Sequence, residues 1–321
     1  MSADRPASVL ARLLNRSRST GENYNLLLSR FAIERLLYRL SVSPHAGNFV
    51  LKGALLFALW FDTPHRPTKD ADLLGFGADD ADTLRSTFTA ICAIDADDGI
   101  RYETEGMRIA PIREDNVYGG LRLTIPAFIG SARLPVQVDI GFGDAITPAP
   151  ETVTFPTLLD DLAAPSLRAY PVYTVIAEKL HAMVVLGMNN SRMKDFFDLA
   201  VIARTTELDG RTLVDAICAT FARRNTSLPT STPAALTTEF SSNPIKAQQW
   251  RTFVTKAGLQ WTSLEEVVGV LAAFLIPAIV ACGIRRDFES KWIPSAREWD
   301  VGGGTSPSSV APSPGQESGA A

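Results

Sequence analysis

Asp70 and Asp72 stand two residues apart in the segment 68–76, whose pattern predicts a β-strand. Because side chains alternate between the two faces of a strand, both carboxylates point to one side, while Ala71 and Leu73 pack inward. Two carboxylates this close repel each other unless a cation lies between them. Oxygen ligands of this kind suit Mg²⁺ or Mn²⁺, so the spacing predicts a divalent-metal site.

A third carboxylate, Asp139, lies in the strand-like run 136–140. Alternation buries the apolar residues of this run and places Gln137 and Asp139 on the opposite face. Three carboxylates on neighbouring strands can hold two divalent ions, which clamp the attacking and leaving oxygens of a phosphoryl or nucleotidyl transfer. Asp139 is therefore the predicted third metal ligand; acidic residues on an exposed edge strand are the structural alternative.

Gly53 precedes Asp70 by 17 residues and opens a predicted helical run over 54–61. Backbone N–H groups at a helix start bind phosphate oxygens, and glycine lets the backbone approach them closely. We add Lys52, Arg66 and Thr68, which flank these two elements, to the predicted phosphate-binding residues. A solvated turn is the alternative for Arg66.

A second cluster of charge lies in two predicted helices beyond residue 170, the second of which Ser191 is expected to cap. Lys179 lies beside the apolar stripe of the first, and Asp195 and Asp198 share a face of the second. Lys179 is predicted to neutralise phosphate charge. Asp195 would orient a substrate hydroxyl or hold Lys179 in place. The structural alternative is an ion pair between Lys194 and Asp198 at i,i+4 spacing.

Charge is uneven along the 321 residues, whose net charge is −4. Residues 1–60 carry eight Arg and Lys against three Asp and Glu, and 24–40 has the spacing of an amphipathic helix. Arginines of 12–39 are candidates for RNA phosphate contacts, with solvation of a helix face as the alternative. The acidic run 95–98 is expected to be a solvated turn.

The order of elements predicts an α+β fold with a mixed sheet. We expect an α/β domain with N-terminal helices over 1–150, an α-helical domain over 151–298 and a disordered tail over 299–321. The apolar stretch 267–283 is long enough for the shortest membrane spans, but its proline and its acidic start favour a buried core helix.

Other residue patterns exclude several classes of protein and indicate the cellular compartment. Cys92, Cys218 and Cys282 form no paired motif, which argues against zinc ribbons and disulfide scaffolds and fits a reducing cytosol. No signal peptide, P-loop or GxSxG motif occurs. His181 shows no metal-ligand spacing and is expected to be a packing residue, with substrate contact as the alternative. We therefore expect a cytoplasmic protein without a membrane anchor.

Taken in order, six stretches resemble the AbiEii/AbiGii-type nucleotidyltransferase toxins of the DNA polymerase β-like superfamily. They are LLSRFAIERLLYRL, FVLKGALLFALW, RPTKDADLLGFG, VQVDIGFGD, VYTVIAEKLHAMV and RMKDFFDL. They run from residue 27 to 199, and their combination is more specific than any one of them. One departure is the superfamily glycine signature, usually Gly-Gly or Gly-Ser, which is Gly53-Ala54 here and lacks a hydroxyl.

The resemblance implies a nucleotidyltransferase core followed by a helical domain, using NTP with Mg²⁺. It also implies a toxin of a toxin–antitoxin or phage-abortive-infection system, which adds nucleotides to RNA, in characterised members at tRNA 3′ ends. Its partner would be an antitoxin of the winged-helix AbiEi kind. The family's metal positions correspond to Asp70 and Asp72, its phosphate-binding lysine to Lys179, and its late acidic position to Asp195 or, as second choice, Asp198.

Two rival functions remain open on the sequence alone. The same fold could transfer a nucleotidyl or phosphoryl group to a protein hydroxyl. A binding module that sequesters a partner protein would need no catalysis, but the Asp70–Asp72 pair, Asp139 and Lys179 argue against it.

Overall fold

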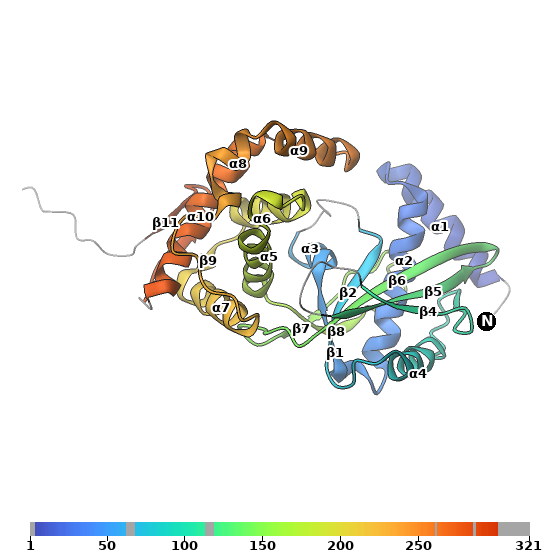
Figure 1. Cartoon of the computed structure of the whole chain (residues 1–321). Helices are drawn as coiled ribbons and strands as arrows, with labels where there is room; N and C mark the ends of the chain where they lie inside the picture. Colours follow the sequence, from blue (N-terminus) through green and yellow to red (C-terminus); the bar gives the residue numbers. More distant parts are fainter. Residues whose placement is uncertain (1–3, 62–67, 113–118, 261, 285–286, 301–321) are drawn as a thin grey trace, which may run out of the picture.

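The computed structural model describes residues 4–61, 68–112, 119–260, 262–284 and 287–300, and a sheet with its own helices lies beside a group of helices (Figure 1). The helical segments of the sheet unit are α1 (Asp4–Thr20), α2 (Tyr24–Val42), η1 (Ala46–Asn48), η2 (Gly53–Leu56), α3 (Phe57–Trp60) and α4 (Ala81–Cys92). Its strands are β1 (Phe49–Lys52), β2 (Asp70–Gly75), β3 (Ile100–Tyr102), β4 (Arg108–Pro111), β5 (Gly120–Ile129), β6 (Ala132–Phe142), β7 (Glu151–Thr154) and β8 (Ser166–Ala169).

The remaining elements form the helical unit and a small second sheet. The helical segments are α5 (Val172–Leu186), η3 (Gly187–Asn189), α6 (Met193–Thr205), α7 (Gly210–Arg223), η4 (Ala234–Leu236), α8 (Thr238–Ser242), α9 (Pro244–Lys256) and α10 (Leu264–Ile284). The strands are β9 (Leu208–Asp209), β10 (Lys291–Ile293) and β11 (Glu298–Asp300).

The main sheet is mixed, with strand order β3-β5-β6-β2-β1-β8-β7 and β4 paired to β5. β2 runs parallel to β6, and β1 runs parallel to β8, while the other pairs are antiparallel. The long hairpin of β5 and β6 turns at Gly130, whose positive φ of 57° suits a two-residue connection. This topology confirms the predicted α+β class.

The buried face of the sheet follows the predicted alternation. In β6, Val136, Val138 and Ile140 are at most 1% exposed, while Gln137 and Asp139 between them are partly exposed. α2 packs on β6 and β8 and is buried on most of its surface, because α4 also lies against it. The carboxylate face of the sheet is thereby left for the helical unit.

The N-terminal arginines correct two expectations. Arg39 donates to both oxygens of Asp98, at 2.6 and 2.9 Å, and Arg35 donates to the same carboxylate at 3.1 Å. All three side chains are at most 3% exposed, so Asp98 lies in the interior and not in a solvated turn. Arg12 and Arg30 form ion pairs with carboxylates on the surface. Arg35 and Arg39 thus hold the fold together and are too buried to contact RNA, while RNA contact by the exposed arginines of 12–39 stays a prediction.

The change from sheet to helices falls later than the predicted boundary at residue 150. β7 and β8 belong to the main sheet, and Leu51 of β1 pairs with Ala169 of β8. At the other end, Trp299 lies in β11 and stacks on Phe274, so the predicted tail from 299 includes two residues of the fold. Residues 301–321 lie outside the described residues.

α10 is the core helix of the helical unit, as expected. Within the described residues it is the one helix long and apolar enough to cross a membrane, but it packs against α6, α7 and α8. Its Cys282 forms a disulfide with Cys218 of α7, with Cα atoms 6.0 Å apart. Cysteine spacing did not predict this bond, because the two residues are 64 positions apart and only helix packing brings them together.

Candidate active site

A row of four charged residues crosses the main sheet on neighbouring strands. Strand register places Lys52 of β1 beside Asp72 of β2, Asp72 beside Asp139 of β6, and Asp139 beside Arg122 of β5. Residues directly opposite in a sheet share a face, so these side chains lie on one surface. Two adjacent carboxylates are thus flanked by one cation at each end.

Asp70 lies one row away from Asp72 on the same face of β2. Its Oδ1 accepts a hydrogen bond from the Thr68 hydroxyl at 2.7 Å, and the Gln137 amide lies 3.5 Å from its Oδ2. Thr68 was predicted to bind phosphate, but in the structure its hydroxyl holds the Asp70 carboxylate.

Gly53 is required by the position of Asp72. Its φ is +75°, which is the left-handed region, and a Cβ added to it would overlap the Asp72 carboxylate. η2 begins at this residue and continues directly into α3, so a glycine-initiated helical segment passes beside the carboxylates as predicted. It begins and ends one residue earlier than the expected run 54–61, and it begins as a 3-10 turn.

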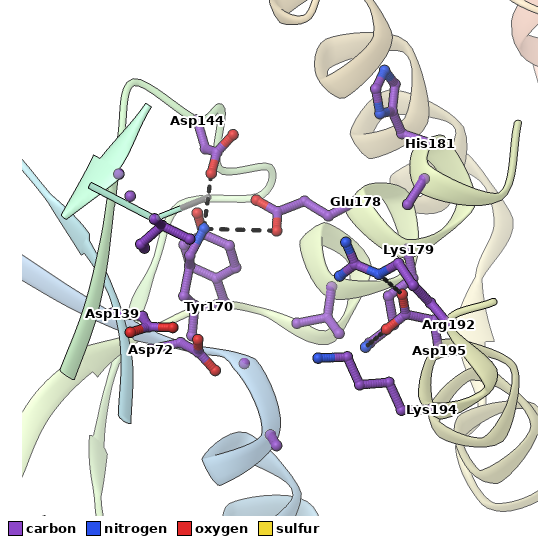
Figure 2. Close-up of a pocket in the computed structure, with 18 of the residues that line it drawn as sticks. Asp72, Asp139, Asp144, Tyr170, Glu178, Lys179, His181, Arg192, Lys194 and Asp195 are labelled. Atoms are coloured by element: carbon purple, nitrogen blue, oxygen red, sulfur yellow. Dashed lines mark hydrogen bonds and ion pairs between the residues drawn. The ribbon is translucent and has the colours of Figure 1, made fainter. Parts of the chain in front are cut away.

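The predicted residues converge on one cleft of about 380 Å³ between the sheet and α5–α7. In Figure 2 the carboxylates of Asp72 and Asp139 face Lys179, Lys194 and Asp195 across this cleft. The predicted residues that line it are Lys52, Gly53, Thr68, Asp70, Asp72, Asp139, Lys179 and Asp195. Arg66 lies outside the described residues.

The negative charges of Asp70 and Asp72 repel each other, and a cation bound between them would remove this repulsion. Burial, together with the negative charge of Asp70, raises the pKa of Asp72 to about 6. This agrees with the predicted mutual repulsion. The oxygen-only donors of Asp70 and Asp72 fit a divalent cation.

The predicted third metal ligand is engaged elsewhere. Asp139 accepts two hydrogen bonds from Arg122, at 2.8 and 2.6 Å, so its charge is already balanced. Among the described residues, no group of three His, Cys, Asp or Glu side chains is arranged to hold a metal ion. The candidate metal site therefore rests on Asp70 and Asp72, and Asp139 as a third ligand stays a prediction, because strand register also places Arg122 beside it.

On the helical side, Lys179 is held between two buried carboxylates. Its Nζ lies 2.7 Å from Asp195 and 2.9 Å from Asp198. Burial alone would raise the pKa of Asp195, but the charges of Lys179 and Arg192 outweigh it and lower the pKa to about 2. Both acidic candidates thus contact the lysine, and Asp198 pairs with Lys179 instead of Lys194.

Sequence reasoning did not single out Lys194 as a cleft residue. Because Asp198 pairs with Lys179, Lys194 does not form the expected i,i+4 ion pair. It lines the cleft instead, and its ammonium group points toward Asp72 in Figure 2. Among the described residues it has no ion-pair partner, whereas Lys52, Lys179, Arg122 and the other cleft cations do. The N-terminus of α6 also differs from expectation, because Ser191 makes no cap and α6 begins after Arg192.

A buried ionic network joins the two units at the base of the cleft. Lys52 donates to Asp144 at 2.9 Å and lies 3.9 Å from Glu178 of α5. Arg224, which follows α7, reaches the same two carboxylates at 2.9 and 3.5 Å. Lys52 was predicted to bind phosphate; here it fixes the sheet to the helices. Asp144, Glu178 and Arg224 carry no local motif, so no sequence signal could have found them.

His181 is a packing residue, as expected, and it makes stability depend on pH. Its Nε2 lies 2.8 Å from the Thr226 hydroxyl and its ring packs edge-on against Phe221. Burial and the positive charge of Arg224 lower its pKa from 6.5 to about 4. We expect a loss of up to about 3 kcal/mol of stability as the pH falls from 6.5 to 4, because only the unfolded chain binds the proton there. Denaturant unfolding at several pH values should show a smaller loss in His181→Gln; equal losses would contradict this.

A cleft that sets the carboxylates of two strands opposite the cations of packed helices, beside a glycine-initiated turn, is suited to nucleotidyl transfer. A family model described as the nucleotidyl transferase AbiEii toxin of type IV toxin–antitoxin systems matches residues 35–266. The chain therefore belongs to the AbiEii family of nucleotidyltransferase toxins, as the sequence motifs predicted.

Comparison with solved structures gives two similar chains from Helicobacter pylori. One, described as a candidate nucleotidyltransferase, is 15% identical, with 82% of this chain and 97% of that chain covered and a TM-score of 0.43. The other, JHP933, is 15% identical, with coverages of 81% and 92% and a TM-score of 0.42. No curated protein sequence matches the chain.

Proposed function

We propose that this enzyme transfers a nucleoside monophosphate from an NTP to the 3′-hydroxyl of an RNA, with tRNA as the acceptor. The observation that carries the proposal is the cleft lined by Asp70 and Asp72 from the sheet and by Lys179 and Lys194 from the helices. In Figure 2 Asp72 faces the two lysines across it. Carboxylates on one wall and cations on the other suit a metal–triphosphate substrate, in which positive and negative charges lie side by side.

Asp70 and Asp72 would hold a divalent ion, Mg²⁺ or Mn²⁺, with Thr68 fixing the Asp70 carboxylate. When bound, such an ion stabilises charge on the attacking and leaving oxygens. Lys194, which has no ion-pair partner among the described residues, would supply charge to the triphosphate. Lys179 would contribute from its fixed position between Asp195 and Asp198. The hydroxyl oxygen bonds to the α-phosphorus, the bond to the bridging oxygen breaks, and pyrophosphate leaves as the hydroxyl proton passes to solvent.

The family also implies an antitoxin partner. We propose a winged-helix protein of the AbiEi kind, and a cytoplasmic site of action, since both NTP and RNA are found there. Examination of the neighbouring reading frames for such a protein is a direct check.

The decisive experiment mixes the purified enzyme with Mg²⁺, total tRNA and each α-labelled NTP in turn. We expect label on RNA, released by ribonuclease and resistant to protease, with one NTP preferred. Label that protease removes would identify a protein acceptor instead. The absence of label from every fraction, with each NTP and with either Mg²⁺ or Mn²⁺, would overturn catalysis and favour a protein-binding role.

Gly53→Ala tests whether the close approach of Gly53 to Asp72 matters. A left-handed alanine costs about 1–2 kcal/mol at any site, and here the added Cβ also displaces the Asp72 carboxylate. A displacement of about 1 Å can cost roughly 10²-fold in rate, so we expect a loss of transfer of that size. Gly21→Ala is the matched control, because Gly21 also has a φ of +75° but no atom within 4 Å of an added Cβ. Equal transfer rates in the two variants would contradict the role of Gly53.

A further inference from the structure

A second cavity opens directly beside the active cleft. It has a volume of about 660 Å³ and lies between the start of α6 and the side of α9. Arg192 and Lys194 line both this cavity and the cleft, so the two adjoin at the start of α6. We call this second cavity the α9 groove.

The charge of the α9 groove favours an anionic occupant. None of the residues that line it is acidic, and Arg192, Lys194 and Lys256 are among them. α9 itself contains no Asp or Glu in its thirteen residues. Gln248, Thr252 and Lys256 follow one another at i,i+4 spacing, so one polar face of α9 lies along the groove.

The floor and one wall of the groove suit a nucleotide rather than a free anion. Met193 and the half-buried ring of Phe253 provide an apolar surface on which a base can lie. Gln248 and Gln249 also line the groove, and side-chain amides can both donate to and accept from base edges and ribose hydroxyls.

We propose that the α9 groove binds the single-stranded end of the RNA acceptor and directs its terminal hydroxyl into the cleft. This inference rests on the proposed transfer to RNA. Phosphates of the strand would lie against Lys256 and continue past Lys194, so the terminal nucleotide would reach Asp70 and Asp72. A protein partner would not need to lie beside the cleft, and the adjoining position together with the basic lining therefore favours RNA as the occupant.

The test measures transfer kinetics and RNA binding in Lys256→Glu and the milder Lys256→Gln. We expect the KM for tRNA to rise roughly tenfold in Lys256→Glu, with the KM for NTP and kcat nearly unchanged. Binding of a short fluorescein-labelled single-stranded RNA should weaken in parallel. The slope of log K against log salt should fall by about 0.7 for the lost phosphate contact in either variant. Lys291→Glu is the matched control, since Lys291 is an exposed lysine of β10 that lines neither cavity.

The outcomes separate the groove from the proposed function. If the wild-type enzyme labels tRNA and both Lys256 variants keep its KM for tRNA and its salt slope, the groove proposal is wrong and the function stands. If Lys291→Glu weakens RNA binding as much as Lys256→Glu, the loss of binding comes from the change in net charge, and the groove proposal is again wrong. If the wild-type enzyme labels no RNA with any NTP, the proposed function fails, and the groove proposal fails with it.

Discussion

Asp72→Asn is expected to lower the rate of nucleotidyl transfer by about 10³-fold, since losing a metal carboxylate removes several kcal/mol of transition-state stabilisation. The same change should not weaken the fold. Burial and Asp70 raise the pKa of Asp72 to about 6 from 3.8, so its ionised form is disfavoured in the folded protein. Between these pH values the folded protein binds more protons than the unfolded chain, and its stability falls as the pH rises. Asn removes that loss, so stability at pH 7 should be equal or higher.

The measurement combines transfer of label from an α-labelled NTP with denaturant unfolding at pH 7. Asp79→Asn is a matched control, because Asp79 is an exposed aspartate that follows β2 and does not line the cleft. Loss of transfer together with loss of stability would mean that Asp72 is structural. Full transfer in Asp72→Asn would remove it from the proposed metal site.

Asp98→Ala is expected to destabilise the protein by about 3–5 kcal/mol. Asp98 is fully buried and accepts hydrogen bonds from Arg39 and Arg35. Removing the carboxylate leaves two buried guanidinium groups without their main counter-charge, which is the costly way to break a buried ion pair. The free energy of unfolding from denaturant titration checks this value.

Asp95→Ala is the control for Asp98→Ala, because Asp95 lies in the same acidic run but is exposed. We expect it to change the free energy of unfolding by no more than about 0.5 kcal/mol. If both variants are equally stable, the run 95–98 is a solvated turn after all and the buried network contributes nothing measurable.

Local pattern was sufficient for the individual parts of the site. Alternation placed Asp70 and Asp72 on one face of a strand, and the structure agrees. The glycine before a helical turn, the Asp139 strand and the Lys179 helix were likewise found in order along the chain. Each of these predictions depends on residues within a few positions of one another, where strand and helix periods determine which way a side chain points.

Long-range partners could not be found in this way. Only strand register sets Arg122 beside Asp139, and only the packing of α6 against α5 sets Asp195 and Asp198 beside Lys179. The same holds for Asp98, whose partners lie about 60 positions earlier in α2. A shift of one residue in any of these registers would send the side chain to the opposite face.

The sequence by itself therefore determined the class of enzyme, the order of its motifs and the faces on which its carboxylates lie. Only the tertiary structure decided which of its charges are paired within the fold and which, like Lys194, line the cleft with no ion-pair partner among the described residues. The reason is that a side chain's direction follows from local backbone geometry, whereas its partner follows from the pairing of strands and helices far apart in the chain.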